Sequence, residues 1–240
     1  MRARYDGHAD WYDATFAQWR DDPDVVDFVN RGLESMSGAL GVDVGCGTGL
    51  HASHVRSRGI DMIGLDASAD QLRHACVRLP VIQADAVRLP FRSDVVALML
   101  AMFVHTDIAD WSACVREIAR CLAPGGRFVC VGLHPCFIGQ HVVRTTEAID
   151  EQLTFRPGYG TSGWSTTGSG GGVGLWSRVG GHHKTLTGFL SPFLDSGLSL
   201  LRVEELRSGG AVLPRNIGVI VERRNSNSCI AIHAPEEFQG

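Results

Sequence analysis

Short apolar runs alternate with amphipathic segments between residues 39 and 133, and this alternation constrains the fold more than any other feature of the sequence. The runs are continuously apolar, which is typical of strands that are covered on both faces of a parallel sheet. Strands that alternate with helices in this way predict an α/β domain. The predicted strands cover residues 40–44, 62–66, 80–83, 95–100 and 127–133.

The amphipathic segment between the last two of these strands is the clearest predicted helix. Its apolar residues repeat with the spacing i, i+3, i+4, i+7 and i+11, so they share one helical face. A Pro-Gly-Gly sequence at 124–126 follows, and we expect it to end the helix and to turn the chain into the next strand. The residues of the predicted face are Trp111, Cys114, Val115, Ile118 and Leu122.

Two features before the sheet predict an N-terminal helical cap over residues 1–38. The first is an aromatic-rich segment that contains Tyr5, Trp11, Tyr12, Phe16 and Trp19. The second is an apolar stripe with helical spacing, formed by Val25, Val26, Val29, Leu33 and Met36. We expect this cap to pack on the domain that follows it.

After residue 133 the regular pattern stops, and it returns only near the end of the chain. Glycine, serine and threonine dominate from 157 to 181, a composition that cannot build its own core. Two later apolar runs, at 198–206 and 216–224, bring the predicted sheet to seven strands. We therefore divide the chain into a cap (1–38), a core (39–133), an insertion (134–197), the last two strands (198–224) and a loosely held tail (225–240).

The composition argues against several classes of partner. Acidic residues outnumber basic ones by 26 to 22, whereas binding to nucleic acid needs clustered Lys and Arg. No apolar stretch approaches the roughly 20 residues of a membrane span, and the N-terminus lacks a signal-peptide core, so we expect a cytoplasmic protein without membrane contact. Seven cysteines without a C-x-x-C pair favour reduced thiols and argue against a thiolate metal site. The oligomeric state stays open, a homo-oligomer included.

The strongest functional signal is a glycine-rich turn directly after the first strand. Residues 42–49 read Val-Asp-Val-Gly-Cys-Gly-Thr-Gly, so Asp43 stands near the strand end and a helix follows the turn. Glycines let the backbone approach a ligand, and a helix start offers free N–H donors. Asp66 closes the next strand, where a carboxylate can accept both hydroxyls of a ribose, and Asp85 follows the third. The acids are therefore predicted at the carboxyl edge of the sheet, where open α/β sheets bind ligands.

These motifs resemble those of the class I S-adenosylmethionine-dependent methyltransferases of the small-molecule type, and the resemblance spans most of residues 1–224. Leu-Ala-Pro-Gly-Gly at 122–126 is a further similarity. The resemblance implies a Rossmann-like, mostly parallel seven-stranded sheet with helices on both faces, and S-adenosylmethionine as the cofactor. A nicotinamide-dependent dehydrogenase is the nearest alternative, but its Gly-x-Gly-x-x-Gly motif needs glycine at position 50, where this chain has Leu50.

The resemblance also implies which residues hold the cofactor. The turn is expected to wrap the methionine part, Asp66 to hold the ribose and Asp85 to face the adenine amino group. The backbone near Leu100 and Ala101 is expected at the methionine end. The full predicted set is Tyr12, Asp43, Gly45, Cys46, Gly47, Gly49, Asp66, Ala67, Asp85, Ala86, Leu100, Ala101 and His105.

Three side chains are candidates for catalysis. His105 follows the fourth strand, at a position where similar proteins often carry His, and His134 ends the fifth, so either is a candidate general base. Tyr12 belongs to a Tyr-Asp pair that is repeated in weaker form at Tyr5, and its ring can lie against the sulfonium or over the acceptor. The alternatives are histidines that pack with one structural hydrogen bond and an aromatic ring that packs on the core.

Motifs that mark other methyl acceptors are missing from the predicted site. Leu-Ala-Met-Phe at 100–103 replaces the Asp/Asn-Pro-Pro-aromatic sequence of methyltransferases that act on base amino groups. Pro135-Cys136 follows the fifth strand, whereas cytosine methylation uses a Pro-Cys after the fourth. The strand end supplies no carboxylates for a divalent metal, so no metal is expected. We therefore expect methyl transfer to an O, N or C atom of a small, partly apolar metabolite, by in-line displacement with acceptor and methyl held at near-attack distance.

The resemblance implies that the insertion 134–197 is a substrate lid, and we expect its apolar side chains to line an acceptor pocket. Its glycine-rich stretch, with Gly168, Gly170, Gly171, Gly172 and Gly174, is either a mobile flap or an insertion with no role. Because a fold does not fix a function, a cyclase, an isomerase or a binding module that keeps the cofactor stays an alternative, as does methylation of a protein. The candidate pocket residues are Phe137, Ile138, Phe155, Trp164, Trp176 and Phe189.

Overall fold

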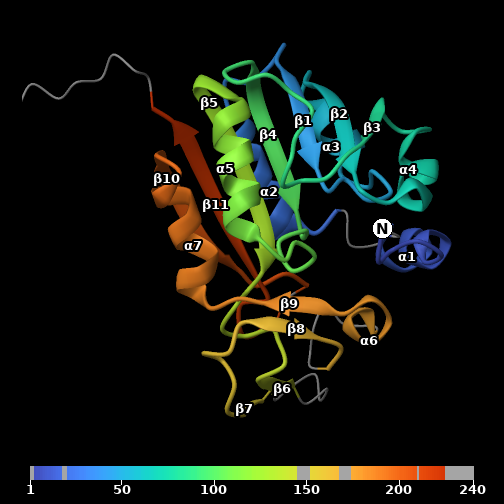
Figure 1. The fold of residues 1–240 in the computed structure, drawn as a ribbon, viewed down its shortest axis with the longest axis vertical. Helices are drawn as coiled ribbons and strands as arrows, with labels where there is room; N and C mark the ends of the chain where they lie inside the picture. Colours follow the sequence, from blue (N-terminus) through green and yellow to red (C-terminus); the bar gives the residue numbers. More distant parts are fainter. Residues whose placement is uncertain (1–2, 18–20, 145–151, 168–173, 210, 225–240) are drawn as a thin grey trace, which may run out of the picture.

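A seven-stranded sheet forms the centre of the computed structural model, which describes residues 3–17, 21–144, 152–167, 174–209 and 211–224 (Figure 1). The strand order is β10-β11-β5-β4-β1-β2-β3, and β11 runs antiparallel to both of its neighbours while the other pairs are parallel. The predicted mostly parallel, Rossmann-like sheet is confirmed. The strands are β1 (Leu40–Val44), β2 (Asp61–Asp66), β3 (Val81–Gln83), β4 (Val96–Met102), β5 (Leu122–Leu133), β10 (Leu198–Leu206) and β11 (Asn216–Arg223).

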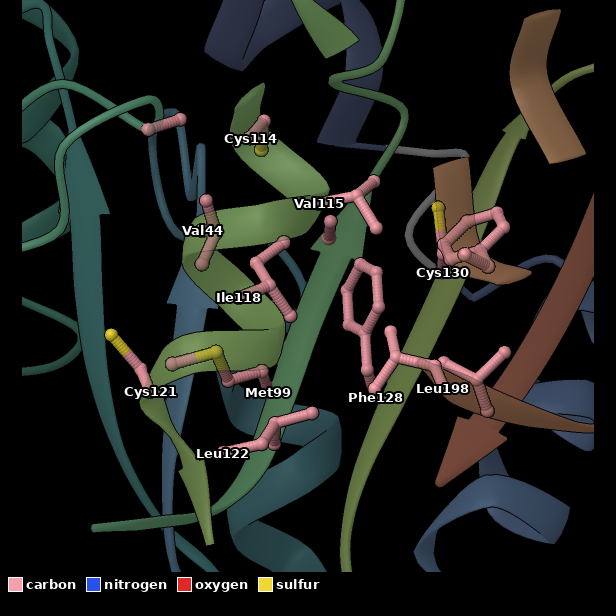
Figure 2. Packing of buried hydrophobic residues seen from close by; sticks show 14 of the residues in the cluster. Val44, Met99, Cys114, Val115, Ile118, Cys121, Leu122, Phe128, Cys130 and Leu198 are labelled. Carbon is pink, nitrogen blue, oxygen red and sulfur yellow. The ribbon is translucent and has the colours of Figure 1, made fainter. Parts of the chain in front are cut away.

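Helices cover both faces of the sheet, as predicted. Helices α5 (Trp111–Cys121) and α7 (Leu186–Asp195) pack on one face, and α2 (Pro23–Leu33), α3 (Ala52–Ser57) and α4 (Ala69–Ala75) pack on the other. Figure 2 shows the first interface, where Val115 and Ile118 of α5 meet side chains of β1, β4, β5 and β10. Each large apolar side chain buried in such a layer contributes about 1.5–3 kcal/mol to stability.

Helix α5 begins as its sequence predicts and ends one residue earlier. The Asp110 carboxylate accepts the Ala113 N–H at 2.8 Å and thereby caps the first turn. The helix ends at Cys121 because Leu122 already pairs with Val96 as the first residue of β5. The Pro-Gly-Gly sequence at 124–126 therefore lies inside an irregular start of β5, and the helix has ended before it.

The segment predicted as an N-terminal cap contains α1 (Ala9–Phe16) and α2 among its described residues. Helix α2 buries Val25, Val29 and Leu33 of the predicted stripe, together with Phe28, while Met36 lies beyond its end. Helix α1 lies beside α4 and is tied to it by an ion pair between Asp10 of α1 and Arg73 of α4, at 3.0 Å (Figure 1). Trp19, in the predicted aromatic segment, lies outside the described residues.

The described part of the segment predicted as a lid contains two antiparallel strand pairs and two helices. Strand β6 (Val142–Arg144) pairs with β7 (Leu153–Phe155), and β8 (Gly163–Ser165) pairs with β9 (Gly181–His183), on either side of the short helix α6 (Leu175–Val179). Helix α7 ends the segment and belongs to the core, where Phe189 is fully buried and its ring stacks on Trp111 at 5.8 Å between centroids. Phe189 therefore packs in the core instead of lining an acceptor pocket. Gly168, Gly170, Gly171, Gly172 and the tail 225–240 lie outside the described residues.

Three further expectations concern cysteines, metals and membranes. Cys46, Cys76, Cys114, Cys121, Cys130 and Cys136 are free thiols, and Cys229 lies in the tail outside the described ranges. Within the ranges described, no three His, Cys, Asp or Glu side chains are grouped so that they could hold a metal ion. No helix in that part of the chain is long and apolar enough to cross a membrane.

Candidate cofactor-binding and active site

A cleft lies at the carboxyl ends of the parallel strands. The loops after β1, β2, β3 and β4 each contribute to its wall, and the N-terminal segment from Ala3 to Tyr12 adds another part. This is the edge at which open α/β sheets bind ligands. The predicted site residues that line it are Tyr12, Gly45, Gly47, Asp66, Ala67, Asp85 and Ala86.

The glycine-rich turn after β1 needs glycine for both conformation and space. Gly45 has φ +71° and Gly47 has φ +54°, values that side chains disfavour. A Cβ at position 45 would also lie 2.3 Å from Cγ2 of Val104, which belongs to the loop after β4. The N–H groups of Gly45 and Cys46 donate to the carbonyl of Leu65 at 2.7 and 3.0 Å. The turn is thus fixed against the end of β2 and lies open to the cleft.

Asp66 joins this turn to the end of β2. Its Oδ2 accepts the Gly47 N–H at 2.9 Å, and its Oδ1 accepts the Ser68 N–H at 2.8 Å. Burial raises the pKa of this carboxyl, and the backbone donors oppose that rise. An ionised carboxylate offers about four lone-pair sites, so Asp66 has acceptors left for hydroxyl groups in the cleft.

Asp85 and Ala86 line a more open part of the cleft, after β3. Asp85 is exposed, and its Oδ1 accepts the Val87 N–H at 3.1 Å, as in a typical Asx turn. The second carboxylate oxygen has no such local bond among the described residues. This oxygen can therefore accept a hydrogen bond from an amino group of a ligand, while Oδ1 keeps its bond to the Val87 N–H.

Five further residues of the predicted set are not part of the cleft wall. Asp43 is buried, its Oδ1 has no hydrogen-bond partner among the described residues, and burial, followed by the charge of Asp66, raises its pKa to about 7. The Cys46 thiol packs against Gly64, and Gly49 packs against Leu79 with φ +78°. Leu100 and Ala101 are buried inside β4.

Tyr12 lines the cleft from α1. Its ring packs edge-on against Tyr5, at 5.6 Å between centroids, and lies 4.6 Å from Phe16. Burial raises the pKa of its phenol, so the hydroxyl stays neutral. The ring is placed to cover a ligand in the cleft, and it also packs in an aromatic cluster.

His105 lies outside the cleft. Its ring is buried beside Phe189 and Trp111, with centroids 4.8 and 6.1 Å away, and burial holds its pKa well below the ordinary value. Space for the ring exists because residue 132 is glycine: a Cβ there would lie 2.3 Å from Nδ1 of His105. The ring therefore fills the core between α5, α7 and β5, and it does not face a ligand in the cleft.

His134 also does not line the cleft. Its Nε2 lies 2.8 Å from Oε1 of Glu205 on β10, and its Nδ1 accepts the Cys136 N–H at 3.2 Å. Because Nδ1 accepts, the neutral ring carries its proton on Nε2 and donates to Glu205. Both nitrogens are thus engaged in structural bonds, and burial lowers the pKa of the ring.

Several residues of the cleft wall carry no motif in the sequence. Arg4 and Tyr5 come from the N-terminal segment, and Phe103 and Asp107 come from the loop after β4. The Tyr5 hydroxyl lies 3.2 Å from each carboxylate oxygen of Asp107, and the Arg4 guanidinium donates to the Asp107 carbonyl. The weaker Tyr-Asp pair at Tyr5 was the only sequence signal for this contact.

Helix α4 holds the N-terminal segment over the cleft. The Asp70 carboxylate accepts the N–H groups of Gly7 and Ala9 at 2.8 and 3.3 Å. Asp13 of α1 forms a two-point ion pair with Arg78, with N–O distances of 2.6 and 2.9 Å. Ion pairs this close to solvent contribute little each, about 0–1 kcal/mol, so several together are needed to fix the segment.

Residues 42–130 match the family described as "Methyltransferase domain". The match runs from β1 into β5 and includes the glycine turn, Asp66 and Asp85. This stretch of the chain is therefore similar to a methyltransferase domain, in agreement with the resemblance found in the sequence. S-adenosylmethionine is the cofactor that the similarity indicates.

A curated methyltransferase is similar to part of the chain. The demethylmenaquinone methyltransferase of Mycolicibacterium paratuberculosis is 34% identical over 89 residues, which are 37% of this chain and 39% of that protein. The chain thus spans about two fifths of the length of the relative that it matches.

Solved structures show the same fold at low sequence identity. An S-adenosylmethionine-dependent methyltransferase from Mesorhizobium loti aligns with a TM-score of 0.71 at 21% identity, over 85% of this chain and 100% of that one. The cyclase SpnF aligns with a TM-score of 0.58 at 18% identity, over 83% of this chain and 80% of that one. At these identities the comparisons show a shared fold and nothing further.

The polar atoms of the cleft fit S-adenosylmethionine. Gln71 lines the cleft, and neither atom of its buried side-chain amide has a hydrogen-bond partner among the described residues. Gln71 lies under the turn, since a Cβ at Gly47 would be 3.5 Å from its Oε1. Donors and acceptors at this end suit the amino and carboxylate groups of methionine, and the Asp66 carboxylate suits a ribose diol.

Proposed function

We propose that this methyltransferase domain transfers the methyl group of S-adenosylmethionine to an O, N or C atom of a small, partly apolar metabolite. The observation that carries the proposal is the bond from the Gly47 N–H to Asp66 Oδ2 at 2.9 Å. This bond links the turn that is assigned to the methionine part of the cofactor with the carboxylate that is assigned to the ribose. The two therefore lie side by side in the cleft. When bound, the cofactor supplies a methyl group on a sulfonium, which is a good leaving group.

The protein's contribution is to hold the two reactants together and to exclude water. Asp66 and Asp85 orient the nucleoside, and the Gly45–Gly47 turn admits the methionine part. Met102, Phe103 and Val104 give the wall after β4 an apolar surface. Holding the acceptor atom and the methyl carbon about 3–3.5 Å apart lowers the barrier to methyl transfer. The Tyr12 ring covers the reacting groups.

We further propose that the described part of 134–185 closes the acceptor side of the cleft. The Arg4 guanidinium lies over the ring of Trp164 on β8, at 4.3 Å, and Arg178 of α6 lies over Trp11 of α1, at 4.5 Å. These two contacts link the segment to the N-terminal wall of the cleft. Limited proteolysis with and without S-adenosylhomocysteine tests this role, since equal cleavage in both conditions would contradict it.

Calorimetry with S-adenosylhomocysteine tests the cofactor assignment. Asp66→Ala removes a charged acceptor, so affinity is expected to fall by the equivalent of about 1.5–3 kcal/mol per bond, roughly 10- to 150-fold. Asp61→Ala is the matched control, because Asp61 begins the same strand at the opposite edge and is exposed. Equal affinity of both variants would remove the ribose assignment.

The acceptor requires a screen with labelled cofactor. Metabolite extracts and demethylmenaquinone, the compound in the name of the relative, are incubated with the protein and labelled S-adenosylmethionine. A labelled product that depends on both the protein and the extract supports methyl transfer.

A cyclase or isomerase that keeps the cofactor is the second candidate, and the shared fold of the cyclase SpnF supports it. Products of unchanged mass, formed with cofactor bound and none consumed, would favour this candidate.

A further inference from the structure

Asp107 faces the cleft from the loop after β4 and has no role in the cofactor assignment above. The strand ends at Met102, and Phe103 adopts φ +61°, a left-handed conformation that side chains seldom occupy. The chain then forms a tight turn, in which the Asp107 N–H donates to the Val104 carbonyl at 2.8 Å. This geometry brings Asp107 beside Phe103 and Val104 in the cleft wall.

The loop is held rigidly on its outer side. The Lys184 ammonium is buried and donates to the carbonyls of His105 and Ile108, both at 2.8 Å. These carbonyls flank Asp107 in the sequence, so Lys184 fixes the loop without occupying the Asp107 carboxylate. A base on a braced loop is better placed than one on a mobile loop, because proton transfer depends on hydrogen-bond geometry.

The charged and titratable groups around Asp107 come from four elements. Tyr5 and Arg4 lie on the N-terminal segment, Tyr12 on α1, Asp66 at the end of β2, and Lys184 before α7. Burial raises the pKa of Asp107 to about 7 and outweighs Arg4, the Tyr5 hydrogen bond and Lys184, which favour the carboxylate. A carboxyl group with this pKa exchanges protons near neutral pH.

The other acid–base groups of the described cleft wall have different assignments. Asp66 and Asp85 belong to the nucleoside, and burial raises the pKa of both Tyr5 and Tyr12. His105 and His134 do not line the cleft. Among the described residues, Asp107 is therefore the carboxylate of the cleft wall that is left for the acceptor.

We propose that Asp107 is the general base for a protic acceptor, one with an ionisable hydroxyl or amino group. This rests on the proposed function and narrows its substrate class. The lone pair of the acceptor O or N forms the bond to the methyl carbon, and the carbon–sulfur bond breaks with its electron pair going to sulfur. The acceptor proton passes to a carboxylate oxygen of Asp107. The products are the methylated acceptor and S-adenosylhomocysteine, and the proton later leaves to water.

Two variants separate a base from a structural clamp. Asp107→Asn keeps the shape and removes the base, whereas Tyr5→Phe removes the hydrogen bond to Asp107 and keeps the base. With the protic acceptor from the screen, Asp107→Asn is expected to lower kcat by about 10²–10⁴-fold and to abolish the rise of kcat with pH near 7. Tyr5→Phe is expected to keep that rise. Equal loss in both variants, with unchanged pH profiles, would show a clamp only and overturn the proposal.

Two measurements decide the matter without turnover. By calorimetry, Asp107→Asn should bind S-adenosylhomocysteine within threefold of wild type; a loss above tenfold would make Asp107 a ligand of the cofactor and overturn the proposal. In the same complex, NMR of ¹³C-labelled aspartate should show two carboxyls that titrate near pH 7, those of Asp43 and Asp107, and one of the two should be missing from Asp107→Asn. A carboxyl that stays ionised from pH 5 to 9 would overturn the assignment. If the wild-type protein methylates no acceptor, that result contradicts the proposed function, and the two measurements above still test the role of Asp107.

Discussion

The His105 ring and the Gly132 backbone fill one space between β5 and α7, since a Cβ at position 132 would lie 2.3 Å from Nδ1 of the histidine. Gly132→Ala must therefore displace a buried ring. We expect the free energy of unfolding to fall by about 1–3 kcal/mol, as for overpacked cores. Urea denaturation measures the change. Gly160→Ala is the control, because nothing lies within 4 Å of a Cβ at that position, and equal stability of the two variants would contradict the packing.

The same histidine predicts a pH dependence of stability. Burial holds the folded pKa of His105 well below the ordinary value near 6.5, so the unfolded chain binds a proton that the folded chain does not. The contribution of His105 to the free energy of unfolding is therefore fully present above about pH 6.5. Below that pH it falls, by up to about 1.4 kcal/mol per pH unit. His105→Gln should reduce the slope of unfolding free energy against pH between 6.5 and 5. An unchanged slope would show that His105 is protonated in the folded protein.

Substitutions at Gly45 test whether the turn requires glycine for its backbone conformation, for the space beside it, or for both. Gly45→Ala places a side chain at φ +71° and within 2.3 Å of Val104 Cγ2, so S-adenosylhomocysteine affinity is expected to fall at least about tenfold. In the double variant Gly45→Ala/Val104→Ala the 2.3 Å contact with Cγ2 is removed, while the Cβ of residue 104 stays 2.9 Å away and the backbone strain remains. Calorimetry should show partial recovery of affinity. Full recovery would mean that space alone requires the glycine.

The contact between Arg178 and Trp11 predicts coupling between α6 and α1. A guanidinium 4.5 Å from the ring centroid is expected to stabilise the pair by about 0.5–1 kcal/mol at an exposed site. A double-mutant cycle with Arg178→Gln and Trp11→Leu measures this coupling in the free energy of unfolding. A coupling energy of zero would show that α6 and the N-terminal segment move independently.

The sheet was predictable from the sequence because its strands are buried on both faces. Strand β1 and strand β10 have the predicted bounds, and β4 extends only two residues further than predicted. Strand β5 starts earlier because Leu122 pairs with Val96 before the Pro-Gly-Gly sequence, a tertiary contact that local turn signals do not reveal. The stripe of α7 fits either a lid or a core helix, and only its neighbours in space decide between them.

The sequence predicted the parts of the cleft whose backbone is fixed by a motif. It did not predict the direction in which individual side chains point. The turn and Asp66 lie together as the resemblance implies. His105 stands in the predicted loop, yet its ring points into the core, and the left-handed Phe103 two residues earlier redirects the chain. Tyr5 meets Asp107 across 102 residues of sequence, which is beyond the reach of any local pattern.

The long sequence separation between Tyr5 and Asp107 affects the order in which parts of the protein fold and unfold. The wall formed by Ala3 to Tyr12 is held to α4 and to the loop after β4 mainly by polar contacts near the surface, whereas β1, β4 and β5 share a dry interior. Ordering a segment through such distant partners comes late, and regions with few buried contacts open first. The amide protons of this wall should therefore exchange with solvent well before those of the central strands, and warming should release bound S-adenosylhomocysteine while the sheet is still intact.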